Sequence, residues 1–405
     1  MKKKKIMSTK IFILLFSITF SGFLSCSDSS LEDQMEPAPE KEEETGEELS
    51  YKEKAKETYD MIQRLYKAGD LYKENYPVRG GDNKHSYLWP YVGMLTAGNL
   101  LYELGYDESI LRKEFKGLEA YYDNRENLPS YQAYPVAEQS SDHYYDDASI
   151  VVMELMEAYR LTKDEFFLER AKTVTEFIMS GEDSRLGGGL YWLETVSGNC
   201  TDEPNCIKAA NTSAYAAYVT SELYKLTEDP KYLEFSKRVY DWTYNTLRDP
   251  SDNLYWNDIV ISTGKISSNP KWTYNAAMMI MSGVNLYEIT GDQHYLNEAV
   301  STARSSFSEF TKVVNDQLFF PSHDPWFNVE LMTAFIELSE HDPASKNYVE
   351  VFIKNADYAW ENARNSDGQF FEDWTGNSEG RYYWLLHQAA LVEAFGRAAL
   401  YKGEG

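Results

Sequence analysis

Two adjacent acids, Asp146 and Asp147, are the strongest chemical candidates in the sequence. They lie in SSDHYYDDASIVV (140–152), where Ser141 or Asp142 can cap the helix that follows. Neighbouring helical residues point about 100° apart, so two carboxyl groups there can reach opposite sides of one bond. A retaining glycosidase needs such a pair about 5–5.5 Å apart, one nucleophilic and one protonated. The alternative is that both acids only complement the helix dipole.

Polar and aromatic residues also gather at other expected helix starts. Each cluster alone fits a helix cap beside a buried aromatic ring, but all follow loops at the same point of a repeat, which indicates a shared cleft. The candidates are Trp192 in GGGLYWLE (187–194), Lys208 and Asn211 in CIKAANTSAYAAYV (206–219), Trp272, Tyr274 and Asn275 in NPKWTYNAAM (269–278), and Trp326 and Asn328 in HDPWFNVELM (323–332). Trp192, Trp272 and Trp326 are expected to stack on sugars. Tyr145, beside the acid pair, is expected to hydrogen-bond a carboxylate or stack on a sugar.

A repeat of about 60 residues positions these clusters. Its best copies are LLYELG (100–105), EAYRLTKD (157–164), ELYKLTED (222–229) and NLYEITGD (285–292), with a weaker AFIELSEHD (334–342). Each copy ends one helical pattern, turns at a polar step and opens another helix, which is typical of a helical hairpin. An apolar face at i, i+4 and i+8, as in Val151, Leu155 and Tyr159, supports amphipathic helices.

About six such hairpins fit the body of the chain, and they predict an all-α fold. They can stack as an open solenoid or close into an (α/α)6 toroid of two concentric helical layers. We favour the toroid, because its inner helix ends would surround one cleft. Strand-like runs are few and short.

The N-terminal residues indicate a secretion signal. Residues 1–25 combine a basic start with the apolar run IFILLFSITF (11–20) and resemble a lipoprotein signal peptide, after which Cys26 would carry the lipid. Residues 26–48 would then be the lipidated Cys and an acidic, disordered tether, and 49–405 the catalytic domain. We therefore expect a bacterial outer membrane lipoprotein on the cell surface or the periplasmic face, attached to the membrane only through its lipid.

The charge and composition of the chain limit the kinds of partner that it is expected to bind. A formal charge of −26 argues against nucleic acid, and an aromatic content of 15% favours a neutral ligand that stacks on rings, such as a sugar. The six histidines show no metal spacing on a helix, and no phosphate-binding loop occurs. We expect no metal, no cofactor and a monomer. Cys200 and Cys206 are plausible disulfide partners in a polar loop.

The paired acids and the repeat together resemble glycoside hydrolase family 76, the endo-acting α-1,6-mannanases. The resemblance rests on YYDD with EAYRLTKD, on GGGLYWLE, IKAANTSAYAA, WTYNAAM, PWFNVELMTAFIEL and YWLLHQAALVEAF, and on SYLWPYVGML (86–95), which contains Trp89. It runs in order from about Tyr51 to the C-terminus. It implies an (α/α)6 barrel, retention of configuration and an α-mannan substrate.

By the same resemblance, Asp146 matches the nucleophile and Asp147 the general acid/base. Lys208, Asn211, Tyr274, Asn275, Trp326 and Asn328 resemble cleft residues, and Trp89 joins the expected substrate contacts. Ala148-Ser149-Ile150 and Ala276-Ala277 replace residues usual in the family. A glycan-binding lipoprotein with weak catalysis on the same fold therefore stays an alternative. So does a six-hairpin epimerase or lyase, although the expected cleft is poor in the histidines or cations such enzymes use.

Overall fold

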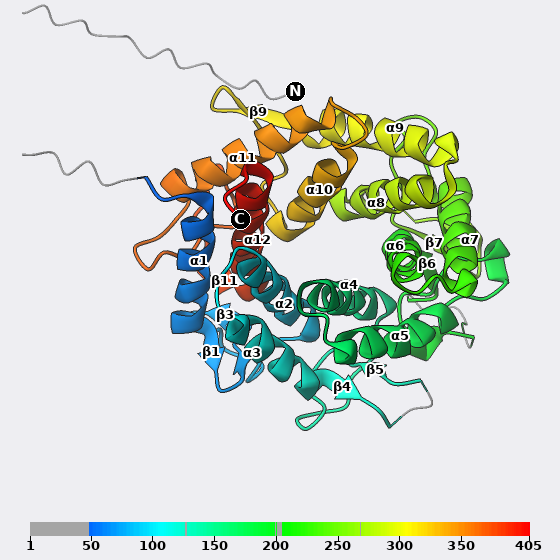
Figure 1. Ribbon diagram of the computed structural model, residues 1–405, viewed down its shortest axis with the longest axis horizontal. Coiled ribbons are helices and arrows are strands. Elements are labelled where there is room, and N and C mark those ends of the chain that lie inside the picture. The colour runs from blue at the N-terminus through cyan, green and yellow to red at the C-terminus, as the bar shows by residue number, and fades with distance from the viewer. Residues whose placement is uncertain (1–47, 126–127, 199, 201–204, 268) are drawn as a thin grey trace, which may run out of the picture. The chain divides into compact units, whose positions relative to one another are not determined.

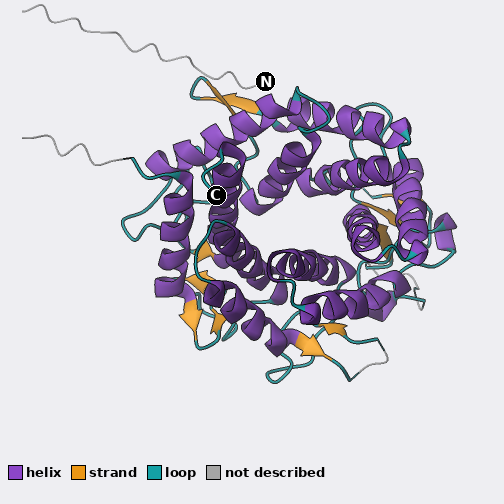
Figure 2. Cartoon of the chain, in the orientation of Figure 1, coloured by secondary structure: helices purple, strands orange, loops and turns teal. Residues whose placement is uncertain are grey.

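The computed structural model describes residues 48–125, 128–198, 200, 205–267 and 269–405, and helices dominate these ranges (Figure 2). The expected signal peptide and all of the expected tether except Glu48 lie outside them. Within the described ranges, no helix is both long and apolar enough to cross a membrane.

Twelve α-helices make up the described part of the chain. They are α1 (Tyr51–Tyr66), α2 (Leu88–Glu103), α3 (Glu108–Leu118), α4 (Tyr145–Thr162), α5 (Glu165–Ser180), α6 (Ala210–Thr227), α7 (Pro230–Leu247), α8 (Thr273–Thr290), α9 (Gln293–Phe310), α10 (Pro325–Leu338), α11 (Ser345–Asn362) and α12 (Leu385–Lys402).

The described residues from Glu48 to Gly405 form a closed ring of two helical layers (Figure 1). The even-numbered helices form the inner layer, in which each packs against the next and α12 packs against α2. The odd-numbered helices form the outer layer. The expected all-α toroid is therefore confirmed. Its sixth hairpin has no turn of its own, because it pairs the first helix with the last, α1 with α12.

The inner and outer helices differ in how much of their surface is buried. The inner helices α2 and α12 are buried on nearly every side, as a helix enclosed by neighbours must be. The outer helix α3 instead buries Leu111, Phe115 and Leu118, which recur at i, i+4 and i+7, and exposes polar residues elsewhere. Hydrophobic patterning along the chain therefore distinguishes a helix of the inner layer from one of the outer layer.

The polar step of the repeat is the turn between an inner and an outer helix. Lys163 ends α4 in the left-handed conformation, with φ 57°, and Glu228 and Gly291 do the same after α6 and α8. The hydroxyl of Thr162 accepts the backbone N–H of Asp164 at 3.2 Å, and the Asp164 side chain then caps α5. The Thr-x-Asp signature thus ends one helix and starts the next.

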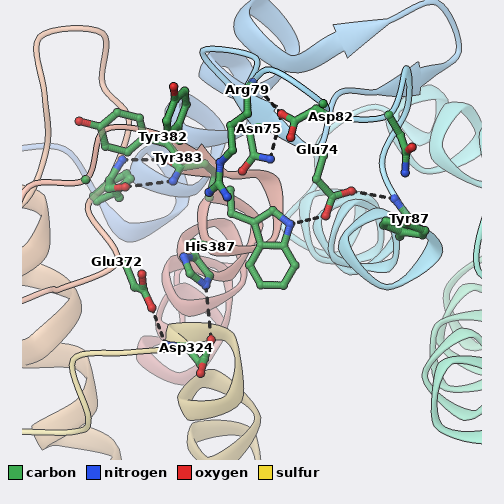
Figure 3. Close-up of a pocket in the computed structure, with 16 residues that line it drawn as sticks. Glu74, Asn75, Arg79, Asp82, Tyr87, Asp324, Glu372, Tyr382, Tyr383 and His387 are labelled. Carbon is green, nitrogen blue, oxygen red and sulfur yellow. Dashed lines mark hydrogen bonds and ion pairs between the residues drawn. The ribbon is translucent and has the colours of Figure 1, made fainter.

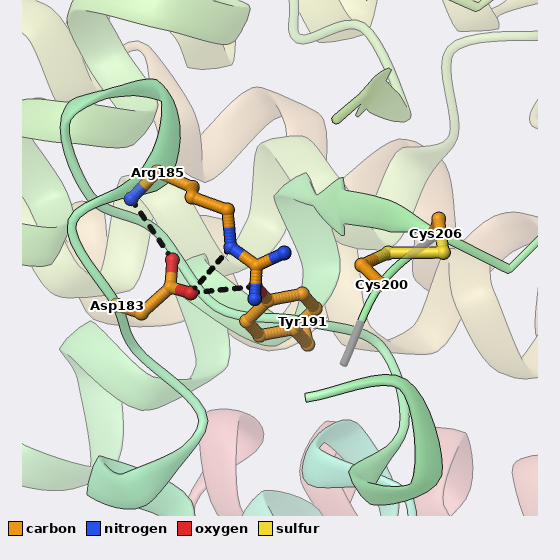
Figure 4. The surroundings of a disulfide bond; sticks show 5 residues. All are labelled: Asp183, Arg185, Tyr191, Cys200 and Cys206. Atoms are coloured by element: carbon orange, nitrogen blue, oxygen red, sulfur yellow. Dashed lines mark hydrogen bonds and ion pairs between the residues drawn. A yellow bond between two sulfur atoms is a disulfide. The ribbon is translucent and has the colours of Figure 1, made fainter. Parts of the chain in front are cut away.

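Short strands connect the helical hairpins. They are β1 (Lys67–Ala68), β2 (Leu71–Tyr72), β3 (Asn75–Tyr76), β4 (Tyr122–Asp123), β5 (Ser130–Tyr131), β6 (Ile207–Ala209), β7 (Asp258–Val260), β8 (Lys265–Ile266), β9 (Lys312–Val314), β10 (Gln317–Phe319) and β11 (Tyr383–Trp384). All pairs are antiparallel, and β6, β7 and β8 form one three-stranded sheet. A disulfide joins Cys200 to Cys206 just before β6, which confirms the expected pairing (Figure 4).

Candidate active site

A cavity of about 850 Å³ opens where the inner helices begin. The first turns of α2, α4, α6, α8 and α10 supply much of its wall, and loops and short strands between hairpins supply the rest. Among its lining residues are Glu74, Tyr87, Trp89, Tyr144, Asp146, Asp147, Ile150, Trp192, Asn211, Tyr215, Asn257, Asp258, Asn269, Tyr274, Trp326, Phe327 and Trp384. Both adjacent acids therefore face a single sugar-sized cavity.

The carboxylate of Asp146 is held by donors from three parts of the chain. Trp192 Nε1 donates to its Oδ2 at 3.1 Å, Asn211 Nδ2 donates to the same oxygen at 2.6 Å, and the backbone N–H of Asp147 donates to Oδ1 at 3.1 Å. Burial raises the pKa of Asp146 to about 6, and these donors limit the rise because they favour the ionised form.

Asp147 has the opposite surroundings. Within the described ranges its carboxyl group takes part in no hydrogen bond, although it lines the same cavity. Burial raises the pKa of Asp147 well above its usual range, and the negative charge of Asp146 raises it further. One acid is thus prepared to be a carboxylate while its neighbour stays protonated, which is how a pair of acids divides the roles of base and acid.

Hydrogen bonds and ion pairs to Asp183 hold the loop that carries Trp192. The Tyr191 hydroxyl lies 2.6 Å and Arg185 Nε 2.8 Å from the Asp183 carboxylate (Figure 4). Lys208 Nζ lies 2.7 Å from the same carboxylate. Burial acts to raise the pKa of Asp183, but these three partners outweigh it and lower the pKa far below normal. This ionic cluster anchors the turn before Trp192.

Glycine is required in that turn. Gly189 has φ +75°, and a Cβ there would lie 2.4 Å from the Trp242 ring. Gly187 and Gly188 also have positive φ, in agreement with the tight turn expected from the three consecutive glycines.

Five of the ten expected substrate contacts line the cavity: Trp89, Trp192, Asn211, Tyr274 and Trp326. The aromatic side chains among them pack against neighbouring rings. The Trp89 and Trp326 centroids lie 5.8 Å apart, and the Trp192 ring lies 5.0 Å from that of Tyr144. Such rings supply flat apolar faces on which a sugar can stack.

The structure places the other five expected contacts outside this cavity. Tyr145 is buried and stacks on Phe177 of α5 with centroids 4.8 Å apart, because its position just before Asp146 on the helix turns it toward the outer layer. Lys208 is also buried, and its amine donates to the Gly189 carbonyl oxygen at 2.8 Å as well as to the Asp183 cluster. The amine therefore serves the loop.

Asn275, Trp272 and Asn328 also lie apart from the acids. Asn275 is buried and donates to Asn257 Oδ1 at 3.2 Å. Trp272 and Asn328 line a neighbouring pocket of about 490 Å³, and Trp272 packs edge-on against Phe327 with centroids 5.5 Å apart. The helix starts do converge, but only one face of each first turn reaches the cavity.

The residues that depart from the family pattern are mostly interior. Ala148 and Ser149 are buried, and the Ser149 hydroxyl donates to the Tyr145 carbonyl oxygen. Ala276 and Ala277 are buried in α8. None of these four lines the cavity, but Ile150, the third changed residue after the acid pair, does line it, so the departures alter one position of the cavity wall.

Sequence reasoning missed several lining residues. Glu74 comes from the short segment between β2 and β3, where its carboxylate accepts Trp384 Nε1 at 2.7 Å and the backbone N–H of Tyr87 at 2.8 Å. Burial raises its pKa. Tyr215 lies one turn beyond Asn211, and its buried hydroxyl has no hydrogen-bond partner within the described ranges. Tyr215 could have been predicted, because it lies at i+4 from Asn211 and therefore on the same face of the helix. No sequence pattern indicated Glu74.

Comparison with known proteins identifies relatives of this chain. The family model described as glycosyl hydrolase family 76 matches residues 50–404. A solved family 76 α-mannanase from Bacteroides thetaiotaomicron is 28% identical with TM-score 0.78, covering 88% of this chain and 97% of its own. An inactive variant of an α-1,6-mannanase from Salegentibacter sp. HEL1_6, with two consecutive aspartates replaced, was solved with α-1,6-mannotetrose. It is 23% identical with TM-score 0.72 over 87% of this chain and all of its own.

Two curated relatives match shorter stretches. A mannan endo-1,6-α-mannosidase from Candida glabrata is 28% identical over 26% of this chain, and a cellobiose 2-epimerase from Bacteroides fragilis is 24% identical over 58%. The chain spans only 23% and 65% of the lengths of these two relatives, respectively.

Proposed function

The chain belongs to glycosyl hydrolase family 76, and from that premise we propose that it hydrolyses α-1,6-mannosidic linkages of α-mannan with retention of configuration. The observation that carries the proposal is the unequal pair of acids. Asp146 accepts three hydrogen bonds and Asp147 accepts none within the described ranges, so the two groups differ in proton affinity in one cavity. The Salegentibacter relative was inactivated by replacing two consecutive aspartates.

In the first step we propose that ionised Asp146 attacks the anomeric carbon. A bond forms between its carboxylate oxygen and that carbon while the glycosidic bond breaks, and Asp147 gives its proton to the departing oxygen. The donors from Trp192 and Asn211 hold the attacking carboxylate in place. The product is a glycosyl ester on Asp146.

In the second step Asp147, now ionised, takes a proton from water. That water attacks the anomeric carbon from the face the leaving group had occupied, and the ester bond to Asp146 breaks. Two inversions give net retention, and Asp147 ends protonated as it began. No other group needs to change charge.

Aromatic side chains support a neutral polysaccharide substrate. Trp89, Trp326 and Tyr274 line the wall, and no Lys or Arg occurs among the described residues that line the cavity. A site for an acidic sugar needs a cation for the carboxylate. The proposed mannan needs only stacking faces and neutral hydrogen-bond partners.

The direct test is incubation of the protein with linear α-1,6-mannan, followed by chromatography and by NMR of the first anomer released. We expect mannooligosaccharides whose first-formed reducing ends are α. Release of the β anomer would refute retention. Binding to mannan without products at high enzyme loading would instead support a glycan-binding lipoprotein, and conversion of a disaccharide to its epimer would support an epimerase.

We further propose that Cys26 carries a lipid that holds the protein in the bacterial outer membrane. The support is the sequence of the first 26 residues, a basic start, a short apolar run and a cysteine. Expression of the full chain in a host that processes lipoproteins, with detergent phase partitioning, tests it. The wild type should enter the detergent phase and Cys26→Ser should not. Equal partitioning of the two would contradict the anchor.

A further inference from the structure

A second pocket, of about 550 Å³, adjoins the catalytic cavity and differs from it in chemistry. The two share Glu74, Tyr87 and Trp384 as lining residues. At one side of the second pocket, the side chains of Asp324, Glu372 and His387 point toward one another (Figure 3). The proposed hydrolysis uses none of these three.

The three residues come from separate segments. Asp324 immediately precedes α10, Glu372 lies in the loop between α11 and β11, and His387 is in the first turn of α12. One potential ligand atom from each lies within 4.8 Å of those from the other two. His387 Nε2 is 3.9 Å from Asp324 Oδ1, which is too far for a hydrogen bond.

The Nε2 atom of His387 makes no hydrogen bond within the described ranges. The residue is only 7% exposed, and its buried Nε2 has no hydrogen-bond partner within the described ranges. Buried polar atoms in native proteins are nearly always paired, and an exception calls for a water, an ion or a functional reason. Here the unpaired nitrogen faces two carboxylates, which points to a cation between the three groups.

We propose that Asp324, Glu372 and His387 bind one divalent cation of the zinc class. An imidazole nitrogen selects Zn²⁺ over Mg²⁺ or Ca²⁺, and carboxylate oxygens complete a common zinc donor set. Ligand bonds of about 2.0–2.2 Å place neighbouring ligand atoms roughly 3.4 Å apart around a tetrahedral ion. The separation of 3.9 Å between Asp324 and His387 would need to shrink only slightly. The fourth position would face the second pocket and hold water.

Such an ion would join elements that shape the catalytic cavity. Asp324 directly precedes the first turn of α10, which carries Trp326 and Phe327, and His387 packs edge-on against Trp384 with centroids 5.0 Å apart. Trp384 in turn donates to Glu74. The ion would therefore fix the first turns of two inner helices and the aromatic wall between them. Because the three ligands are distant in sequence, the spacing of histidines along the chain could not reveal this site.

The test measures metal binding by the full chain, purified without a histidine tag and stripped with a chelator. Isothermal titration with Zn²⁺, and with Ca²⁺ for comparison, should give one saturable site per chain that prefers Zn²⁺. Glu372→Gln changes an exposed side chain and should weaken Zn²⁺ binding about tenfold or more, as the loss of a ligand requires. His387→Ala should abolish the site.

The matched control is His341→Ala. His341 also has a carboxylate beside it, with Nε2 3.0 Å from Glu288 Oε1, but it belongs to no group of three ligands within the described ranges. Its loss should leave Zn²⁺ affinity and stoichiometry unchanged. Thermal unfolding with and without Zn²⁺ gives a second readout, in which the metal should raise the midpoint of the wild type and of His341→Ala but not that of Glu372→Gln.

Three results would overturn the proposal. They are no saturable Zn²⁺ binding, binding that both His387→Ala and Glu372→Gln retain, and binding that only His341→Ala removes. A crystal soaked in Zn²⁺ adds a direct check, because the anomalous peak must lie between the three side chains. Hydrolysis of mannan is not part of this test, so its outcome is independent of the proposed catalytic function.

Discussion

Buried and half-buried carboxyl groups occur in two parts of the ring, and they differ in what surrounds them. At the beginning of the inner helices lie Asp146 and Asp147. Farther along the same helices lies a second group, comprising Glu154, Glu222, Glu330, Glu337 and Glu393. Burial raises the pKa of Glu154 and of Glu337 to about 7 and that of Glu330 well above normal. A raised pKa therefore does not by itself mark a catalytic acid.

Arginines or hydrogen-bond donors contact four members of the second group, including Glu222, Glu393 and Glu154. Arg397 Nε lies 2.7 Å from Glu393, and Arg160 contacts Glu222. Glu154 accepts hydrogen bonds from Thr96 at 2.7 Å and from Asn99 at 2.8 Å. The pocket beside this group is about 260 Å³, against about 850 Å³ at the acid pair.

The contrast identifies what chemistry needs beyond burial. Asp146 has neutral donors, and Asp147 has none within the described ranges, so neither acid is locked in an ion pair. Both line a cavity large enough for a sugar, whereas Glu154, Glu222 and Glu337 line a smaller pocket. Glu222 and Glu393 also contact arginines. Catalysis is expected only where two acids of unequal proton affinity share an accessible cavity.

The largest effect should come from exchanging carboxyl for amide in the two regions. Asp146→Asn removes the proposed nucleophile and Asp147→Asn the proposed proton donor. Each change should lower kcat on α-1,6-mannan by about 10²–10⁴-fold or more, the size of a lost acid/base or nucleophilic contribution. The measurement is initial rate at saturating substrate.

Glu337→Gln is the matched exchange in the second region. Glu337 is half-buried, as Asp146 and Asp147 are, and the amide oxygen of the variant can still accept the hydroxyl of Tyr218, now 3.1 Å away. We expect its kcat to stay within about twofold of the wild type, since it lies outside the cavity. A loss comparable to that of the aspartate variants would remove the functional distinction between the two regions.

The next prediction concerns the pH dependence of the wild type. The proposed mechanism needs Asp146 ionised and Asp147 protonated. Because the pKa of Asp146 is raised to about 6, kcat/KM should fall about tenfold per pH unit as pH drops below that value. It should fall again at higher pH, where Asp147 loses its proton. The two apparent values belong to the pair.

A steady kcat/KM between pH 4 and 9 would contradict this division of roles. Glu337→Gln should show the same two limbs as the wild type, because the group it removes does not touch substrate. A profile that changed in this variant would mean that the second region controls the protonation of the acid pair.

A smaller effect is expected from a single donor to Asp146. Trp192→Phe keeps a ring but removes the Nε1 hydrogen bond to Oδ2. That bond favours the ionised carboxylate, so its loss should raise the pKa of Asp146 and move the acidic limb of kcat/KM to higher pH. We expect kcat to fall roughly tenfold or more, the usual worth of a hydrogen bond to a charged group.

Trp89→Phe is the control for ring size. Trp89 lines the same cavity, but no hydrogen bond from its indole to either acid occurs within the described ranges. It should raise KM and leave the acidic limb in place. If both tryptophan variants moved the limb equally, the effect would reflect cavity shape and not the donor to Asp146.

The sequence predicts the ring and the acid pair because both rest on local patterns. The Thr-x-Asp turn repeats with its left-handed residue, and Asp146 and Asp147 are neighbours whatever the fold. The other site residues depend on side-chain direction. Tyr145 is adjacent to Asp146 yet points into the outer layer, and Glu74 reaches the cavity from a short segment with no motif. Such placement follows from packing across the ring, which helix period alone does not fix.

The smallest effect should be on stability, again at Glu337. Burial and the charge of Glu222 raise its folded pKa to about 7, above about 4.5 in the unfolded chain, although the Tyr218 hydroxyl opposes the rise. The folded state then binds more protons than the unfolded state between these values. This group's contribution is therefore present below about pH 4.5 and is lost as pH rises through 7. Glu337→Gln does not lose stability in this way, because its amide does not titrate.

We therefore expect the difference in Tm between Glu337→Gln and the wild type to shift in favour of the variant by a few degrees from pH 5 to pH 8. Thermal unfolding at the two values measures it. Comparing wild type and variant at each pH cancels the titration of the acid pair, which both proteins share. Glu340→Gln, an exposed change one turn away, should show no such shift. If the two variants shifted equally, Glu337 would behave like a surface carboxyl group. The distinction between the second region and the protein surface would then be wrong.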